Sequence, residues 1–140
     1  MQISKTLFAA AVAATASSAA PLEARDADWI IRGVSRACDG QDSSCTWTFS
    51  VDNQLSAPTA CTYVVKASGG QPASRSSGGP VTCGNYRVTS GWSGQFVVGF
   101  TTFAVFDTTK NLIAYPAYND DEIAAGNVAD KPFHVEAPKY

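Results

Sequence analysis

The chain has 140 residues, of which 45% are hydrophobic and 16% are charged, and its formal net charge is −2. This length fits one ordinary domain, and the composition is too apolar and too weakly charged for a disordered chain. The lack of a basic excess argues against nucleic acid as a partner. A single histidine, His134, limits the acid–base chemistry that the chain can offer.

Residues 1–19 have the layout of a secretory signal peptide. Lys5 is the positive charge of its first part, residues 7–14 are the apolar part, and small residues follow up to Ala19. The apolar run is shorter than the roughly 20 residues that cross a bilayer. We therefore predict secretion to the extracellular space and no membrane span. Residues 20–28 are predicted to be a leader, which is either flexible or processed a second time after Arg25.

Residues 29–140 are predicted to form one domain of short β-strands. Residues 45–52 alternate apolar and polar side chains without a fault, as a half-buried strand does. Further strands are predicted over residues 29–34, 62–66, 86–89, 112–115 and 133–135. Residues 96–107 are too long for one regular strand, so Gly99 is expected to mark a bulge or bend. Residues 108–111 predict the turn of a hairpin.

One short helix is predicted to follow Asn119. Asn119 is a good N-cap, the acidic residues 120–122 suit the positive end of a helix, and Gly126 is a natural stop. Six to eight short strands with no helix between them predict an all-β fold. It should be a compact antiparallel β-barrel or a sandwich.

The four cysteines predict two disulfides, as is usual in a secreted chain. Three pairings are possible. We favour Cys38–Cys45 and Cys61–Cys83, because each closes a local loop rich in turn residues. In the chain-entropy model these bridges contribute about 2.5 and about 3.4 kcal/mol. The second bridge also spans residues 68–79, a glycine- and serine-rich segment that is not expected to order itself.

No pattern in the sequence predicts catalysis, a metal site or a cofactor. His134 is the only histidine for a Ser–His–Asp triad, and no G-x-S-x-G motif is present. Zinc is not expected, because no cysteine pair has C-x-x-C spacing. Asp39 and Asp42 lack the register of a calcium loop and predict a turn instead. We expect that the protein is not an enzyme.

Trp92 is the strongest candidate for a binding residue. It stands between Gly91 and Gly94, outside the alternating pattern, so it could project from a loop to stack on a sugar or enter a partner's pocket. The more common alternative is that it packs back on the end of the fold, along a tight path that the glycines allow. The predicted binding residues are Trp92, Gln95 and Tyr118.

Several motifs, in order along nearly the whole mature chain, resemble those of one family. They are residues 20–25, Trp29, the Cys38-to-Cys45 spacing, residues 45–49, residues 61–63, Ser90-Gly91-Trp92-Ser93-Gly94-Gln95-Phe96, residues 99–102 and residues 115–120. The chain resembles the hypersensitive response-inducing proteins, small secreted elicitors or effectors of plant-associated fungi, which are related in style to the fungal major-allergen-type β-barrels. One departure is Val97-Val98, where this family is expected to have a more polar, glycine-containing stretch.

The resemblance implies a compact β-barrel that is secreted into the host apoplast and provokes plant cell death and defence responses. It implies no catalytic residues. The expected partner is a plant cell-surface or apoplastic component. The alternative function is a carbohydrate-binding module that holds cell-wall polysaccharide through Trp92 and nearby aromatic side chains.

Overall fold

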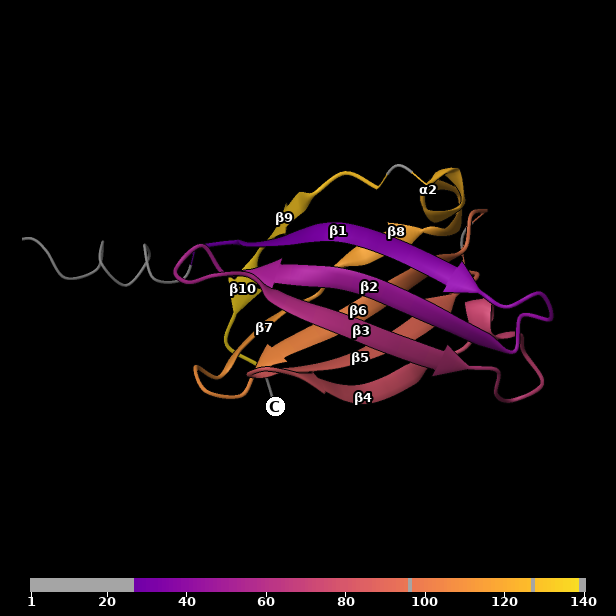
Figure 1. Ribbon diagram of the computed structural model, residues 1–140, viewed down its shortest axis with the longest axis horizontal. Helices are drawn as coiled ribbons and strands as arrows, with labels where there is room; N and C mark the ends of the chain where they lie inside the picture. The colour runs from indigo at the N-terminus through magenta and orange to yellow at the C-terminus, as the bar shows by residue number, and fades with distance from the viewer. Residues whose placement is uncertain (1–26, 96, 127, 139–140) are drawn as a thin grey trace, which may run out of the picture.

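The chain forms two antiparallel β-sheets that pack face to face (Figure 1). The computed structural model describes residues 27–95, 97–126 and 128–138, so the predicted signal peptide and most of the predicted leader lie outside the described residues. The first sheet has the spatial order β3 (Thr59–Lys66), β2 (Ser44–Asp52), β1 (Trp29–Cys38) and β9 (Lys131–Phe133). The second has the order β10 (Val135–Glu136), β7 (Leu112–Ala114), β6 (Phe100–Asp107), β5 (Tyr86–Ser93) and β4 (Gly78–Cys83), with β8 (Ala117–Asn119) also beside β6.

The predicted all-β class is confirmed, and the architecture is the sandwich. A closed barrel is not formed, because the described strands divide into two separate sheets. Ten strands are found in the described residues, where six to eight were predicted. The strands without a predicted counterpart are β4, in a glycine- and proline-rich segment, and the three-residue β8, and the one strand predicted over residues 133–135 is found as two, β9 and β10. Such short strands contain too few residues to show an alternating pattern.

Strand β2 shows why the alternating segments fold as they do. Cys45, Trp47, Phe49 and Val51 are all buried, whereas the threonines and serines between them face outward. Because side chains alternate across a strand, this pattern can bury its apolar residues only on one face of a sheet. The other predicted strands are also present, although residues 133–135 divide between β9 and β10 with His134 between them.

Phe103 of β6 lies at the centre of the core. Its ring is 4.9 Å from that of Trp47, 5.6 Å from Phe49 and 5.4 Å from Tyr63, all on the first sheet. The contacts to Trp47 and Tyr63 are edge to face, a favoured geometry for aromatic pairs. One side chain of the second sheet thus holds three rings of the first.

The two sheets are also joined covalently along both edges. The disulfide Cys61–Cys83 links β3 to β4, and the chain itself passes from β9 to β10 through His134. The other disulfide, Cys38–Cys45, closes the β1–β2 hairpin within the first sheet. Both predicted pairings are confirmed, and the structure gives the second one its specific role as a link between sheets.

The segment of residues 68–79 is ordered, and contacts from outside the segment contribute to this order. It contains the short 3₁₀ helix η2 (Ala73–Arg75) and a buried serine, Ser76, whose hydroxyl donates to the carbonyl of Pro72 at 2.8 Å. Asp42, from the β1–β2 turn, receives the backbone N–H of Ser74 at 2.9 Å and that of Ala73 at 2.8 Å. A polar contact within the segment and two from Asp42, which is distant in sequence, therefore order what composition alone presents as a loose loop.

The predicted helix is confirmed as α2 (Asp120–Ala125). Asn119 is its N-cap, and the backbone N–H of Asn119 donates to Glu122 Oε1 at 3.1 Å, as a capping box requires. Gly126 ends the helix at φ 79°, in the left-handed conformation that glycine adopts without strain. In the part of the chain that is described, no helix is both long and apolar enough to span a bilayer.

Removing the inter-sheet disulfide should cost more stability than removing the hairpin disulfide. By restricting the unfolded chain, Cys61–Cys83 is expected to stabilise the fold by about 3.4 kcal/mol and Cys38–Cys45 by about 2.5 kcal/mol. We expect the Cys61→Ala/Cys83→Ala pair to lower the free energy of unfolding by about 1 kcal/mol more than Cys38→Ala/Cys45→Ala, measured by urea denaturation. The reverse ranking would contradict the assigned role of the second bridge.

Candidate functional site

The candidate site begins with a β-bulge in β1. The register of β1 on β2 shifts between Arg32 and Ser35, and Gly33 within the shift has φ 65°. Its backbone N–H donates to Asp130 Oδ1 at 2.9 Å. Before the bulge the odd-numbered residues Trp29 and Ile31 face the core, whereas after it the even-numbered ones do. The bulge therefore turns Arg36 toward the interior.

Arg36 lies over the buried ring of Trp47. Its guanidinium carbon is 5.4 Å from the ring centroid, and the two residues are direct neighbours across β1 and β2. The Arg36 side chain is only 13% exposed, and its Nη1 faces Asp120 Oδ1 at 3.9 Å. Among the described residues neither atom has a hydrogen bond, so the charges of this half-enclosed pair attract each other directly.

Asp120 joins this arginine to Trp92. Its other carboxylate oxygen, Oδ2, accepts the indole N–H of Trp92 at 2.9 Å, and its backbone N–H donates to the carbonyl of Gly99 at 2.8 Å. Asp120 is the first residue of α2, Trp92 lies near the end of β5, and Gly99 immediately precedes β6. Asp120 thus connects the first sheet and β5 through its carboxylate, and helix α2 and the β5–β6 loop through its backbone.

Trp92 packs back on the fold, as the more common of the two alternatives predicts. A Cβ at Gly99 would lie 2.6 Å from the indole, and a Cβ at Gly94 would lie equally close. The guanidinium of Arg75, from η2, lies over the same ring at 5.6 Å. The half-buried indole is therefore held by two glycines and an arginine, and its role in binding stays a prediction.

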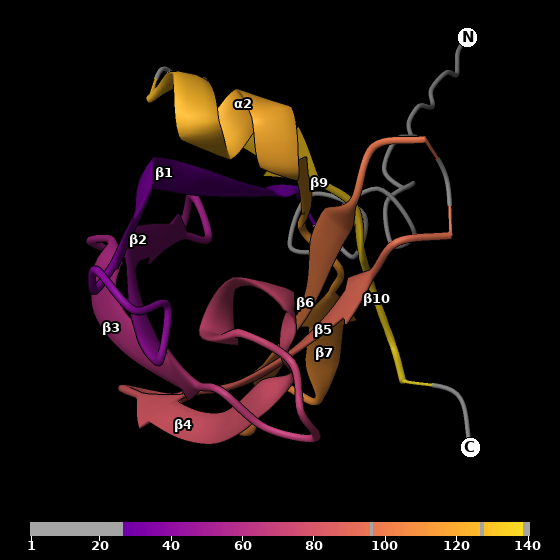
Figure 2. The ribbon, with the colours of Figure 1, turned by 90° about the vertical axis from the view of Figure 1, so that its right-hand side faces the viewer.

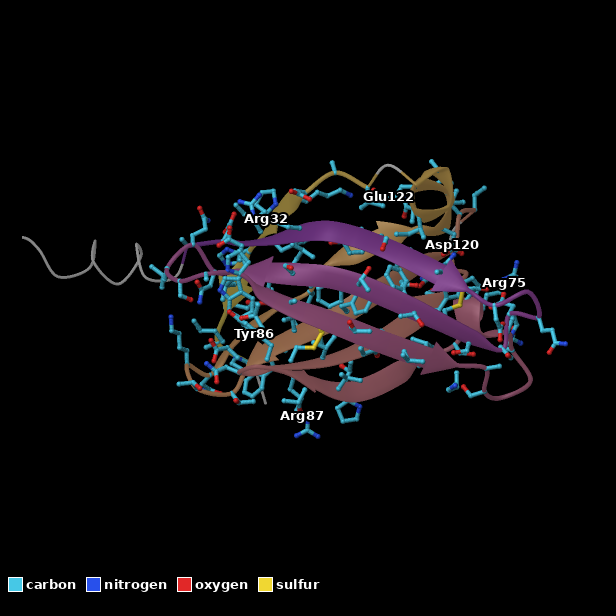
Figure 3. The ribbon with its side chains drawn as sticks, viewed as in Figure 1. Arg32, Arg75, Tyr86, Arg87, Asp120 and Glu122 are labelled. Carbon is cyan, nitrogen blue, oxygen red and sulfur yellow. A yellow bond between two sulfur atoms is a disulfide. The ribbon has the colours of Figure 1, made fainter. Side chains whose placement is uncertain are left out.

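These residues gather at one end of the sandwich. Figure 3 shows Asp120 and Arg75 at this end, whereas Arg32 and Tyr86 lie toward the other. In Figure 2 the same end faces the viewer, with α2 along one side and the connection between β5 and β6 extending outward. We call Arg36, Arg75, Trp92 and Asp120 the tryptophan cluster.

The other two predicted binding residues have different positions. Gln95 is exposed in the β5–β6 loop, beside the tryptophan cluster, and its binding role stays a prediction. Tyr118 does not lie on that surface, because it is 2% exposed and packs in the core 6.4 Å from both Trp47 and Phe103. Burial raises the pKa of its phenol. The alternation of β8 turns Tyr118 inward, a direction that its three-residue strand did not reveal.

The helix of the cluster is fixed by a second ion pair. Lys131 of β9 donates to Glu122 Oε2 at 2.8 Å, and this contact lowers the pKa of Glu122. The Lys131 ammonium also lies 5.3 Å from the centroid of the Tyr118 ring. Helix α2 is thereby tied to the edge strand of the first sheet, which keeps Asp120 in position.

The remaining titratable candidates lie elsewhere and have structural contacts. His134 is 80% exposed at the corner between β9 and β10, with Nδ1 3.7 Å from Asp28 Oδ1. Asp39 accepts the backbone N–H of Ser43 at 2.7 Å, which is the predicted turn, and the Ser43 contacts lower its pKa. Cys38, Asp42 and Cys45 lie close together, but the two sulfurs are bonded to each other and offer no thiolate.

The tryptophan cluster can hold a loop rigidly and present an arginine to a partner. Sequence reasoning identified Trp92 but missed Arg36, Arg75 and Asp120. Asp120 was assigned to helix capping, and the two arginines are separated from Trp92 by 56 and 17 positions in the chain. Arg36 reaches the inner face because of the bulge in β1, and no pattern in the sequence indicates that bulge.

Comparison with known proteins identifies one family. The family model described as Effector TSP1 matches residues 30–139. A curated protein of the fungus Hypocrea virens (strain Gv29-8 / FGSC 10586), named Effector TSP1, is 52% identical over 136 residues, an alignment that covers 91% of each chain. The matched region includes every strand of both sheets except the first residue of β1.

The close approach of Gly99 to Trp92 and Asp120 makes this position intolerant of a side chain. A Cβ there would lie 2.6 Å from the indole and 2.7 Å from the carboxylate. We expect Gly99→Ala to lower the free energy of unfolding by about 1–3 kcal/mol. Gly40→Ala is the matched control, because a Cβ at Gly40 meets open space. Equal urea midpoints for the two variants would contradict the packing described.

The hydrogen bond between Trp92 and Asp120 should appear as an energetic coupling. Trp92→Phe keeps an aromatic ring but removes the donor, and it should cost about 1–3 kcal/mol. Combined with Asp120→Ala in a double-mutant cycle, it should give a coupling of about 0.5–3 kcal/mol, measured by chemical denaturation. Strict additivity of the two changes would show that the contact contributes nothing.

Proposed function

The chain belongs to the Effector TSP1 family, and from this membership we propose that it is a secreted fungal effector that acts on a plant host by binding, without catalysing a reaction. The host response in this proposal is cell death and defence of the hypersensitive type. The target is a component of the plant cell surface or apoplast.

Secretion is supported by the cysteines and by the sequence at the N-terminus. All four cysteines are paired, as is usual for proteins of oxidising compartments and rare in the cytosol. Residues 1–19 have the composition of a signal peptide. The two observations are independent and support the same location.

The observation that carries the proposed binding mode is the connection of Arg36, Asp120 and Trp92 across both sheets. It fixes the base of the β5–β6 loop to the core through an ion pair at 3.9 Å and a hydrogen bond at 2.9 Å. A surface that is ordered before a partner arrives loses less conformational entropy on binding. Loops on a rigid β-scaffold are common recognition surfaces for this reason.

Leaf infiltration tests the proposal against a linear-peptide explanation. Folded wild-type protein should cause an oxidative burst and local cell death, whereas reduced and alkylated protein should lose most of this response, because both disulfides hold the binding surface. Equal responses to the two preparations would mean that a linear segment is sensed. No response to folded protein would refute the proposed effect on the host.

The exposed histidine allows a direct comparison with an enzymatic mechanism. His134→Ala should retain the wild-type response in the same assay, because its side chain is remote from the tryptophan cluster in the fold and 80% exposed. Loss of the response in a folded His134→Ala protein would instead favour acid–base chemistry at this corner.

A further inference from the structure

The β5–β6 loop carries the most exposed large apolar side chain among the described residues. Val97 is 105% exposed relative to an extended reference, and Val98 next to it is 36% exposed. A loop tip in water is ordinarily made of polar or turn-forming residues. Two adjacent valines at such a place leave apolar surface in water that contact with a partner would remove.

The base of this loop is rigid although its tip is exposed. Gly94 and Gly99 flank the tip, and both approach the ring of Trp92 so closely that neither has room for a Cβ. Gly99 is further held by the backbone N–H of Asp120 at 2.8 Å. Figure 2 shows the connection between β5 and β6 extending away from the body of the sandwich. The valines are thus presented on a fixed stem.

A positive charge stands beside the stem. Arg75 stacks on Trp92 with its guanidinium carbon 5.6 Å from the ring centroid, and its side chain is exposed. The ion pairs found in the described part of the chain involve other cations, so this guanidinium has no carboxylate partner there. The N–H donors of an arginine lie in the plane of its guanidinium group. When that group stacks on an aromatic ring, its donors can still bind a carboxylate.

We infer that Val97 and Val98 form an apolar knob that enters a pocket of a host cell-surface protein, and that an acidic side chain at the rim of that pocket pairs with Arg75. The inference rests on the proposed function, because it names the chemistry of the partner that the effector binds. Arginine is among the residues enriched in interface hot spots, and the exposed valines supply apolar area that contact with a pocket would bury.

The charges around the knob favour a protein over a lipid surface. Binding to anionic lipid uses clusters of several lysines and arginines, whereas the tryptophan cluster has two arginines, of which Arg36 is already paired with Asp120. Asp120 and Asp121 begin α2 directly beside Gly99 and would repel anionic headgroups. A protein pocket needs only one acidic group to pair with Arg75, whereas an anionic bilayer presents many charges to the whole surface.

The experiment measures binding of fluorescently labelled full-length protein to right-side-out plasma-membrane vesicles from leaves. Val97→Asp should weaken binding about tenfold or more, because it places a charge in an apolar pocket. Val64→Asp and Leu55→Asp are matched controls, since these side chains are 41% and 54% exposed at other places on the molecule. Both controls should bind within about twofold of the wild type.

The charge is tested separately. Arg75→Glu should weaken binding about tenfold or more, Arg75→Lys should weaken it less, and Arg87→Glu on the outer face of β5 should have little effect (Figure 3). Circular dichroism and urea midpoints confirm that each variant is folded. Wild-type binding should also fall as salt is raised, since an exposed ion pair is screened.

Two further preparations identify the kind of partner. Vesicles treated with protease, and liposomes of phosphatidylcholine and phosphatidylserine in a four-to-one ratio, should bind the wild type far more weakly than untreated vesicles. Equal binding to the liposomes would overturn the inference in favour of a lipid surface. Wild-type affinity in folded Val97→Asp, or no binding of the wild type to untreated vesicles, would also overturn it.

The leaf response separates failure of this inference from failure of the proposed function. If Val97→Asp still causes the full response of the wild type, the inference that the valines enter a host pocket is wrong, and the proposed effector function stands. If the folded wild type causes no response, the effector function on plants is wrong, whatever the vesicles bind.

Discussion

The edge-to-face contact between Trp47 and Phe103 is the interaction on which both the core and the candidate site depend. It joins the inner faces of the two sheets at a ring separation of 4.9 Å. Arg36 lies over the same Trp47 ring, and from Arg36 the contacts continue through Asp120 to Trp92 and Arg75. The candidate site is therefore an extension of the core. A change that loosens the core aromatic packing will also displace the loop, so losses of stability and of activity will be hard to separate without stability measurements on each variant.

Most regular elements could be predicted from the sequence, because each is encoded by neighbouring residues. The alternation of β2, the capping box of α2 and the local pairing of the four cysteines are all of this kind. What could not be predicted depends on residues far apart in the chain. The first strand was predicted to end at Val34, where the bulge interrupts the alternation, although β1 continues to Cys38. Residues 68–79 were not expected to order themselves, and the part played by Asp42 could not be foreseen because Asp42 lies outside the segment.

The inter-sheet disulfide relates the fold to the place where a secreted effector would act. Arg36 belongs to the first sheet, whereas Trp92 and Asp120 belong to the second sheet and the helix that follows β8. Cys61–Cys83 keeps the two sheets at a fixed separation on one edge. In an oxidising apoplast this geometry is preserved, whereas the reducing cytosol of a host cell would remove the covalent restraint. This restraint agrees with the proposal that the protein acts outside the host cell.

The bulge at Gly33 has a consequence for how β1 can vary. Substituting a residue in this strand alters one set of contacts, but adding or removing one residue near Gly33 exchanges the two faces of everything that follows up to Cys38. After a removal Ala37 would replace Arg36 above Trp47, and after an insertion Ser35 would; in both cases the arginine would point to solvent, while the backbone ladder with β2 could still form. Whether Arg36 faces the interior thus depends on the number of residues that precede it in β1 as well as on their chemistry.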